Sequence, residues 1–232
     1  MPKITLDSNY QATEAASGFA QSRAIRRWLI AFAATAVLVL LCIAFVDRPV
    51  ADFVATHTRN TRLFDYLLEF FRIIPAMVPL GLLTLFVTGG LALEGKRCPR
   101  WLEAPSVCSW SLVWAVAATL VFKHIFGRTG ADPEYITEGK YEFAFMHGGP
   151  IFGGPGHDSF PSGTMAVAGA LIGVLWVAYP RMRSLWASIL LINAIGLIVT
   201  NFHFVGDVLG GTYLGLLIAA LTLQLHRPTE HR

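Results

Sequence analysis

Six long apolar stretches, separated by polar segments, dominate the pattern along this chain. Each stretch contains 18 to 22 residues and no Asp, Glu, Lys, Arg or His. A helix that crosses the ~30 Å hydrocarbon core of a membrane needs about 20 such residues. The pattern therefore predicts an all-α integral membrane bundle of six transmembrane helices, at Trp28–Val46, Ile73–Leu93, Ala104–Phe122, Ser159–Pro180, Ser184–Phe202 and Val208–Leu225.

The segments around these stretches suggest one domain, residues 25–226, between a polar N-terminal tail (1–24) and a short C-terminal tail (227–232). We expect the N-terminal tail to be either loosely ordered or an interfacial helix. Asp47–Arg72 is predicted to be a long loop, in which Phe64–Phe71 is either an amphipathic interfacial helix or an ordinary linking helix. The glycine-rich segment Lys123–Asp158 is longer than most loops, and such loops are usually functional or disordered; we favour function.

Composition supports a membrane protein and excludes other classes. The chain is 54% hydrophobic and 14% charged, with a mean hydropathy of +0.55, whereas soluble domains are about 25% charged. The net charge is +3 and no basic run indicates nucleic acid. The three cysteines include no Cys-x-x-Cys pair, so the sequence indicates neither a metal site nor a disulfide, and we expect no cofactor.

Lysine and arginine predict the orientation. Eleven of them lie before the first stretch, between the second and third, between the fourth and fifth, and after the sixth, and seven lie on the other side. The positive-inside rule then places both termini in the cytoplasm, most simply of a bacterial inner membrane, and Lys123–Asp158 on the periplasmic or outer face.

Two helix starts carry candidate chemistry. Pro161-Ser162-Gly163 opens the fourth stretch, where proline suits the first helical turn and the free amides attract an anion; an ordinary helix cap explains the same tripeptide. His203 and Asp207 stand four residues apart, so the carboxylate can hold one ring nitrogen and leave the other free to attack phosphorus. A capping histidine with an interfacial Asp is the alternative.

Lys123 and Arg128 follow the third stretch, within Lys123–Thr129. Cations at this helix end can clamp phosphate oxygens. Long basic side chains also lie along apolar surface at helix ends with their charge in water, which is the structural alternative.

In this order, the motifs resemble the type-2 phosphatidic acid phosphatase family, which is related in its catalytic core to the vanadium haloperoxidases. The family pattern is Lys-x6-Arg-Pro, Pro-Ser-Gly-His and Ser-Arg-x5-His-x3-Asp, and the resemblance covers roughly residues 115–220. A branch with Gly-Arg-Thr, Phe-His-Gly-Gly and Phe-Pro-Ser-Gly is also similar, and these segments are Gly127–Thr129, Met146–Gly149 and Phe160–Gly163 here.

The resemblance implies a role for each matching residue. His203 is the nucleophile that forms a phosphohistidine, and Asp207 orients it. Lys123, Ser162 and the Gly163 amide hold the phosphate oxygens.

Arg128 is a further phosphate-binding candidate, although it stands two residues before Gly130, where the family arginine falls. Thr164 occupies the position of the family histidine that protonates the leaving oxygen, Leu197 that of the third-motif arginine, and Gly130-Ala131 that of Arg-Pro.

Loss of a general acid typically costs ~10²–10⁴-fold in rate, and we expect a good leaving group, such as that of a pyrophosphate, to suffer less from this loss than a simple alkyl phosphate. His157 is the candidate replacement acid, with His147 as a second; both are equally explained as loop histidines without a catalytic role. Arg62 or Arg72 can supply charge from the first long loop.

The sequence therefore predicts a metal-independent membrane lipid phosphatase that hydrolyses a phosphate monoester or pyrophosphate on a lipid head group. The family implies phosphatidate-like lipids, phosphatidylglycerophosphate, polyprenyl pyrophosphates and lipid A phosphates as substrates. One alternative is a lipid phosphotransferase that passes phosphate from histidine to another lipid. The other is a catalytically weak relative that binds phospholipid head groups.

The predicted topology is testable with reporter fusions. Fusions after Leu93 and after Arg183 should report the cytoplasm, and fusions within Tyr141–Pro155 should report the exterior, because lysine and arginine favour that orientation. Paired alkaline phosphatase and fluorescent protein reporters give opposite signals on the two sides and control for each other. An exterior signal at Arg183 would contradict the orientation.

Overall fold

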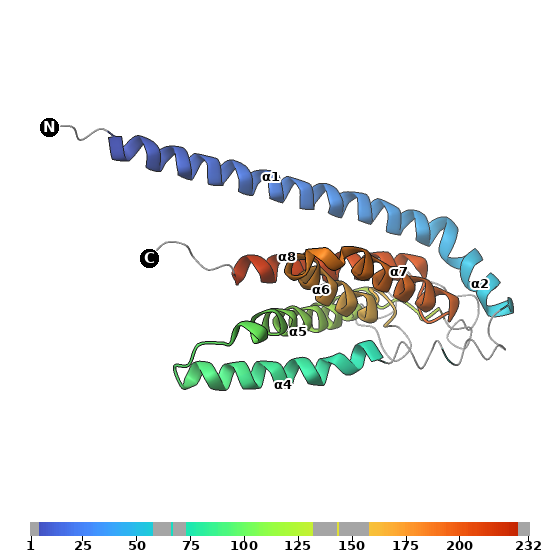
Figure 1. Cartoon of the computed structure of the whole chain (residues 1–232). Coiled ribbons are helices and arrows are strands. Elements are labelled where there is room, and N and C mark those ends of the chain that lie inside the picture. Colours follow the sequence, from blue (N-terminus) through green and yellow to red (C-terminus); the bar gives the residue numbers. More distant parts are fainter. Residues whose placement is uncertain (1–4, 58–65, 67–72, 132–142, 144–157, 227–232) are drawn as a thin grey trace. The chain divides into compact units, whose positions relative to one another are not determined.

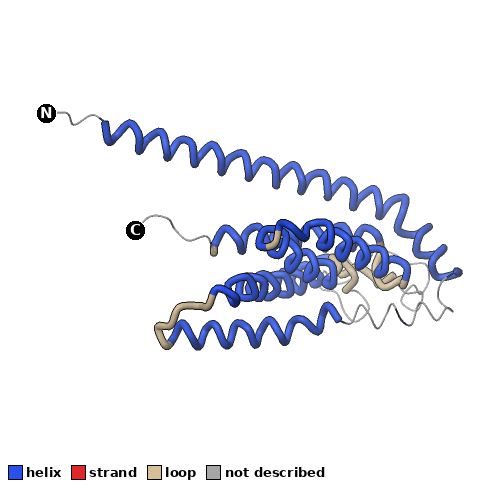
Figure 2. The backbone as a smooth tube through the Cα atoms, viewed as in Figure 1, coloured by secondary structure: helices blue, strands red, loops and turns tan. Residues whose placement is uncertain are grey.

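The computed structural model describes residues 5–57, 66, 73–131, 143 and 158–226, and helices joined by loops make up this part of the chain (Figures 1 and 2). The helical elements in chain order are α1 (Thr5–Leu41), a π-helical segment (Cys42–Val46), α2 (Asp47–His57), α4 (Ile73–Leu93), α5 (Arg100–Phe126), α6 (Gly163–Ala178), a 3-10 turn (Pro180–Met182), α7 (Arg183–Val199) and α8 (Val205–Leu225). The predicted all-α class is confirmed.

Among the described residues, five helical stretches are long and apolar enough to cross a membrane, and they are Ser22–His57, Ala76–Leu93, Arg100–Phe126, Pro180–Val199 and Val205–Leu225. The sixth apolar helix, α6, has only 16 residues and rises about 24 Å at 1.5 Å per residue. It is shorter than the predicted stretch because Ser159–Ser162 precede the helix and form its cap.

The first apolar helix does not end at Val46 as expected. A π-helical segment follows α1, and the chain continues in the same helical course through α2 to His57. The first part of the predicted loop Asp47–Arg72 is therefore helical. The proposed amphipathic segment Phe64–Phe71 lies outside the described residues, apart from Tyr66.

The chain divides into two compact units, Met1–Val37 and Leu38–Arg232. Within the first unit the described residues form most of α1, which begins at Thr5, so the polar N-terminal tail is helical from that residue on. The second unit contains all remaining helices and every candidate site residue that the structure describes.

In the second unit, α6 and α8 form the most extensive helix contact, and α5 packs against both. Small residues line the contact between α6 and α8. A Cβ atom added at Gly215 of α8 would overlap the Ala166 carbonyl oxygen, and one at Gly211 would overlap that of Ser162. Such small residues let helix backbones approach closely, as in membrane helix pairs with glycine at every fourth position. This approach brings the start of α6 beside the start of α8.

Large apolar side chains face outward, as expected for a protein surrounded by lipid rather than water. Leu93 and Phe86 on α4 are 92% and 81% exposed, and similar side chains lie on the outer faces of α5 and α7. Polar side chains, in contrast, gather inside the second unit, where Asp47, Arg128, Ser162 and Asp207 are almost completely buried.

The α6–α8 contact predicts a position-specific effect of adding one methyl group. Gly215→Ala should destabilise the protein by roughly 1–3 kcal/mol, because overpacking forces two backbones apart. Gly90→Ala in α4 is the matched control, since nothing lies within 4 Å of its added Cβ and alanine has the higher helix propensity. Thermal unfolding in detergent measures both; equal melting temperatures would contradict the close contact.

Candidate active site

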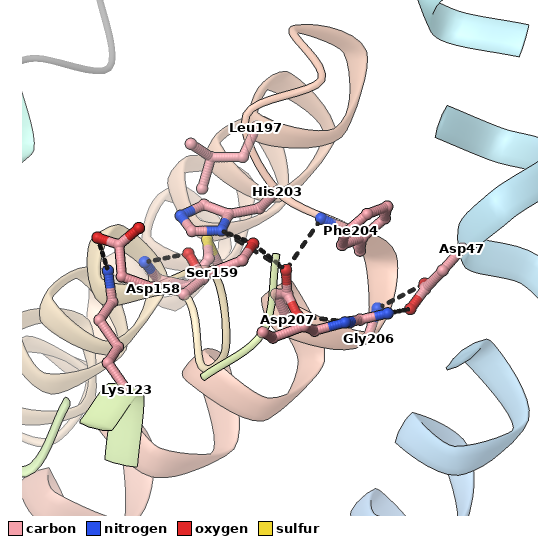
Figure 3. Close-up of polar contacts among 12 residues, drawn as sticks. Asp47, Lys123, Asp158, Ser159, Leu197, His203, Phe204, Gly206 and Asp207 are labelled. Atoms are coloured by element: carbon pink, nitrogen blue, oxygen red, sulfur yellow. Dashed lines mark hydrogen bonds and ion pairs between the residues drawn. The ribbon is translucent and has the colours of Figure 1, made fainter. Parts of the chain in front are cut away.

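His203 lies in the turn between α7 and α8, and one face of its ring is held by two polar side chains (Figure 3). Its Nδ1 atom is 3.3 Å from the Ser159 hydroxyl and 3.7 Å from Oδ2 of Asp207. The Ser159 hydroxyl donates to the same Oδ2 at 2.6 Å, so its oxygen remains able to accept from Nδ1–H. Serine thus bridges histidine and carboxylate, which the sequence expected to be in direct contact.

This arrangement leaves Nε2 of His203 without a hydrogen-bond partner among the described residues, and the side chain is only 6% exposed. With Nδ1 protonated, Nε2 carries the lone pair. The ring is therefore held in the tautomer and orientation that a nucleophile at Nε2 requires.

Asp207 is completely buried, and its carboxylate accepts hydrogen bonds from three groups. Oδ1 accepts from Arg128 at 2.5 Å, and Oδ2 accepts from Ser159 and from the Phe204 amide at 3.2 Å. Asp207 is the third residue of α8 and Phe204 its N-cap, so the carboxylate also satisfies a free amide at the helix start. A charge at this depth is tolerated because of these partners.

The turn that carries His203 is fixed at both ends. The amides of Phe202 and His203 both donate to the Leu197 carbonyl oxygen, at 3.0 and 3.2 Å. Asn201 adopts a left-handed conformation (φ 54°), which asparagine tolerates better than most residues, and its side-chain amide donates to the Ala51 carbonyl oxygen at 3.2 Å. The turn is therefore anchored to α7 and to α2.

Ser162 is the N-cap of α6, and its hydroxyl oxygen accepts from the Met165 amide at 3.3 Å. Pro161 was expected in the first helical turn, but the helix begins at Gly163 and Pro161 precedes the cap. The Ser162 amide donates to the Asp207 carbonyl oxygen at 3.1 Å, which ties the two helix starts together. The Ser162 hydroxyl still has its hydrogen to donate.

Lys123 brings a cation to the start of α6. Its ammonium group lies 3.6 Å from Asp158, and a Cβ atom added at Gly163 would be 3.8 Å from its Nζ. Figure 3 shows Lys123 and Asp158 on one side of the His203 ring and Asp47 on the other. Gly127, with φ 54°, ends α5 in a left-handed C-cap that favours glycine and turns the chain after Lys123.

Arg128 has a different environment from the one expected of a phosphate-binding cation. It is 1% exposed, and its two terminal nitrogens bind Asp207 and, at 2.6 Å, Asp47. Burial by itself lowers the pKa of the guanidinium, but the carboxylates of Asp207 and Asp47 raise it, and the net shift is upward. The guanidinium also lies against two aromatic rings. Its carbon is 4.4 Å from the ring centroid of Phe204 and 5.2 Å from that of Phe143.

The remaining predicted residues divide into two groups. His147 and His157, the candidate replacement acids, lie outside the described residues, as do Arg62 and Arg72. Thr164 is partly exposed in the first turn of α6, and Leu197 is buried against Met165 and Val208. At the position of the family arginine, this chain therefore has a side chain of the apolar core.

Sequence reasoning missed Asp47 and Ser159. Ser159 directly precedes the Phe160–Gly163 motif, and a polar residue at that point was the available signal. Asp47 ends the first apolar stretch, where an acidic residue is ordinarily interfacial. Within the described ranges, no three His, Cys, Asp or Glu side chains are grouped to hold a metal ion.

Comparison with known proteins identifies a family and a similar fold. The family model for the PAP2 superfamily matches residues 107–230. A similar solved structure is the crystal structure of the first transmembrane PAP2 type phosphatidylglycerolphosphate phosphatase from Bacillus subtilis. That structure is 17% identical, the match covers 86% of this chain and 98% of that chain, and the TM-score is 0.56. Among curated proteins, no match is found.

Proposed function

Because this chain belongs to the PAP2 superfamily, we propose that it is an integral membrane lipid phosphatase that uses His203 as its nucleophile. The observation that carries the proposal is the buried Ser159–Asp207–His203 arrangement, which leaves Nε2 free beside a helix start and a lysine. The substrate class is a lipid that carries a phosphate monoester or pyrophosphate. The solved structure that resembles this chain supports the membrane fold of such an enzyme.

The first step is attack on phosphorus. Nε2 of His203 forms an N–P bond while the P–O bond to the lipid breaks, and the leaving oxygen takes a proton from solvent water or from His157, the candidate acid. The water that attacks in the second step returns that proton. The ring becomes a cation with Nδ1 still protonated, and the Ser159 hydroxyl and the Asp207 carboxylate stabilise that charge. In the second step, water attacks phosphorus, the N–P bond breaks, and inorganic phosphate leaves with neutral histidine restored.

The phosphate oxygens bind at the start of α6. The free amides of Gly163 and Thr164 belong to the first helical turn, where partial positive charge favours an anion. The Ser162 hydroxyl and the Lys123 ammonium supply further donors, and Lys123 exchanges its contact with Asp158 for the phosphate. Arg128 does not take part in this binding in our proposal, because two carboxylates already hold it.

The site lacks the family's usual acid for protonating the leaving oxygen. Thr164 has no acidic proton to give, and Leu197 adds no charge. We therefore favour lipid pyrophosphates, whose leaving phosphate needs little protonation, over alkyl phosphates. His157 remains the candidate acid. The active site faces the exterior or periplasm in this proposal, with both termini cytoplasmic, and the reaction requires no metal.

Replacement of His203 tests the nucleophile. His203→Ala should reduce phosphate release from a lipid pyrophosphate to background while the protein stays folded in detergent, because no other group forms the N–P bond. Asp207→Asn should keep a residual rate, since part of the geometry survives loss of the charge. Vanadate should inhibit the wild type and chelators should not.

His226→Ala is the matched control, because that histidine is the C-cap of α8 and its ring bonds to the Thr222 carbonyl oxygen of the same helix. Acid-labile radiolabel mapped to the peptide that contains His203 would identify the intermediate. Wild-type turnover retained in His203→Ala would refute the mechanism, and transfer of label to a second lipid instead of water would indicate a phosphotransferase.

Restoring the missing acid should change leaving-group dependence. Thr164→His places an imidazole on the first turn of α6, beside the proposed phosphate site. It should raise turnover of an alkyl phosphate by about 10-fold or more and change that of a pyrophosphate little, since only the poor leaving group needs strong protonation.

Rates for phenyl phosphates of graded leaving-group acidity measure this dependence. Thr164→Ser is the control, because it keeps the hydroxyl and adds no acid. The same leaving-group slope in Thr164→His and wild type would show that protonation does not come from this position.

A further inference from the structure

We propose that Asp47, a residue on the first membrane-crossing helix, is a positioning residue for the phosphoryl transfer assigned above to His203. It acts through Arg128 and Asp207 and touches neither substrate nor the reacting atoms. The inference rests on the proposed function, and it adds a residue that lies outside the matched family region, residues 107–230.

Five side chains form a continuous buried chain of contacts (Figure 3). Oδ2 of Asp47 accepts from Arg128 at 2.6 Å, and the other end of the same guanidinium donates to Asp207 at 2.5 Å. Asp207 then reaches His203 through Ser159. The Asp47, Arg128 and Asp207 side chains are 1%, 1% and 0% exposed, so water does not screen these charges.

Asp47 is held at two points. Its Oδ1 atom accepts from the Gly206 amide at 3.0 Å, in the first turn of α8, while Oδ2 binds Arg128. A Cβ atom added at Gly206 would lie 3.0 Å from Oδ2 of Asp47 and 3.5 Å from the Arg128 guanidinium. Glycine at this position therefore permits the carboxylate to approach both the helix start and the arginine.

The backbone before Asp47 is specialised as well. The Asp47 amide donates to the Cys42 carbonyl oxygen, five residues earlier, which is the hydrogen-bond pattern of a π-helix. Each such turn adds a residue relative to an α-helix and rotates the residues that follow. Single π-helical turns within longer helices are frequent at functional sites. Here the turn directly precedes the only buried acid of α2 among the described residues.

Charge explains what Asp47 contributes. Two carboxylates and one guanidinium carry a net charge of −1 behind His203. When Nε2 attacks phosphorus the ring gains a positive charge, and the buried group becomes neutral overall. Without Asp47, the same group starts neutral and ends at +1 in a medium where an uncompensated charge is costly. Asp47 therefore favours the transition state over the ground state.

Other charged groups face His203 and must be kept constant in a test. Among the described residues these are Lys123, at the end of α5, and Asp158, which binds it. Both lie on one side of the ring and Asp47 lies on the other (Figure 3). Arg128 binds Asp47 and Asp207, so a change at Asp47 leaves the Lys123 side, where the proposed phosphate binds, intact.

The central variant is Asp47→Asn in the full chain, in detergent micelles, with a short-chain lipid pyrophosphate as substrate. Asparagine keeps the shape of the side chain and one of its two acceptor oxygens, so it removes the charge and one of the two hydrogen bonds. We expect kcat to fall about 10-fold or more with KM unchanged, and the acid limb of the kcat profile to move about one unit to lower pH, because a buried negative charge is lost.

Two comparisons separate positioning from general damage. Asp52→Asn, an exposed acid on the same helix, should leave kcat, KM and the pH profile unchanged. In an Asp207→Asn background, Asp47→Asn should cost less than about threefold more, because it acts through Asp207 and the effects of coupled residues are not additive. Equal losses in both backgrounds, or a change in KM alone, would overturn the inference.

The kinetics of Gly206→Ala and the binding of vanadate provide two further tests. If Asp47→Asn does not fold, Gly206→Ala is the alternative variant, because it displaces the Asp47 carboxylate without removing it. It should lower kcat at constant KM, and wild-type kinetics would overturn the inference.

If the wild type releases no phosphate, the proposed function fails, and vanadate binding measured by calorimetry tests the inference instead. Asp47→Asn should then bind vanadate about 10-fold more weakly than Asp52→Asn; equal affinity, or no binding by the wild type, overturns the inference.

Discussion

The buried guanidinium of Arg128 is the constraint on which the site depends. A charge inside an apolar bundle is costly unless partners surround it, and Asp47 and Asp207 provide those partners from two separate helices. The interaction fixes the position of α2, of the segment after α5 and of the start of α8 with respect to one another. The orientation of His203 follows, because Asp207 and Ser159 hold its ring.

The site also requires that the starts of α6 and α8 lie close together, and small residues make this possible. Gly211 and Gly215 allow α8 to approach the backbone of α6, so two helix starts meet and the Ser162 amide binds the Asp207 carbonyl oxygen. In the proposed mechanism, one helix start supplies amides for an anion and the other carries the nucleophile and its carboxylate. Van der Waals packing within the bundle thus determines the distance between the two halves of the proposed chemistry.

In the proposed mechanism, the groups for attack on phosphorus are all present, whereas those that would stabilise the leaving group are reduced. Leu197 packs in a core cluster with Met165 and Val208, so a hydrophobic contact replaces the charge that the family pattern has at this position. Arg128 does not compensate for that loss, because its charge is already balanced by carboxylates. Under the proposed mechanism, we therefore expect a preference for substrates whose leaving group carries its own stabilised charge.

The sequence alone determined the helical class, the approximate helices and the pairing of His203 with Asp207, because apolar length and four-residue spacing are local properties. Ser162 and Gly163 at one helix start followed from their motif for the same reason. Tertiary structure alone decided that Ser159 bridges His203 and Asp207, that Arg128 binds two carboxylates, and that Asp47 belongs to the site. Asp47 and Asp207 are 160 positions apart in the chain, and only the packing of their helices around one buried charge brings them together.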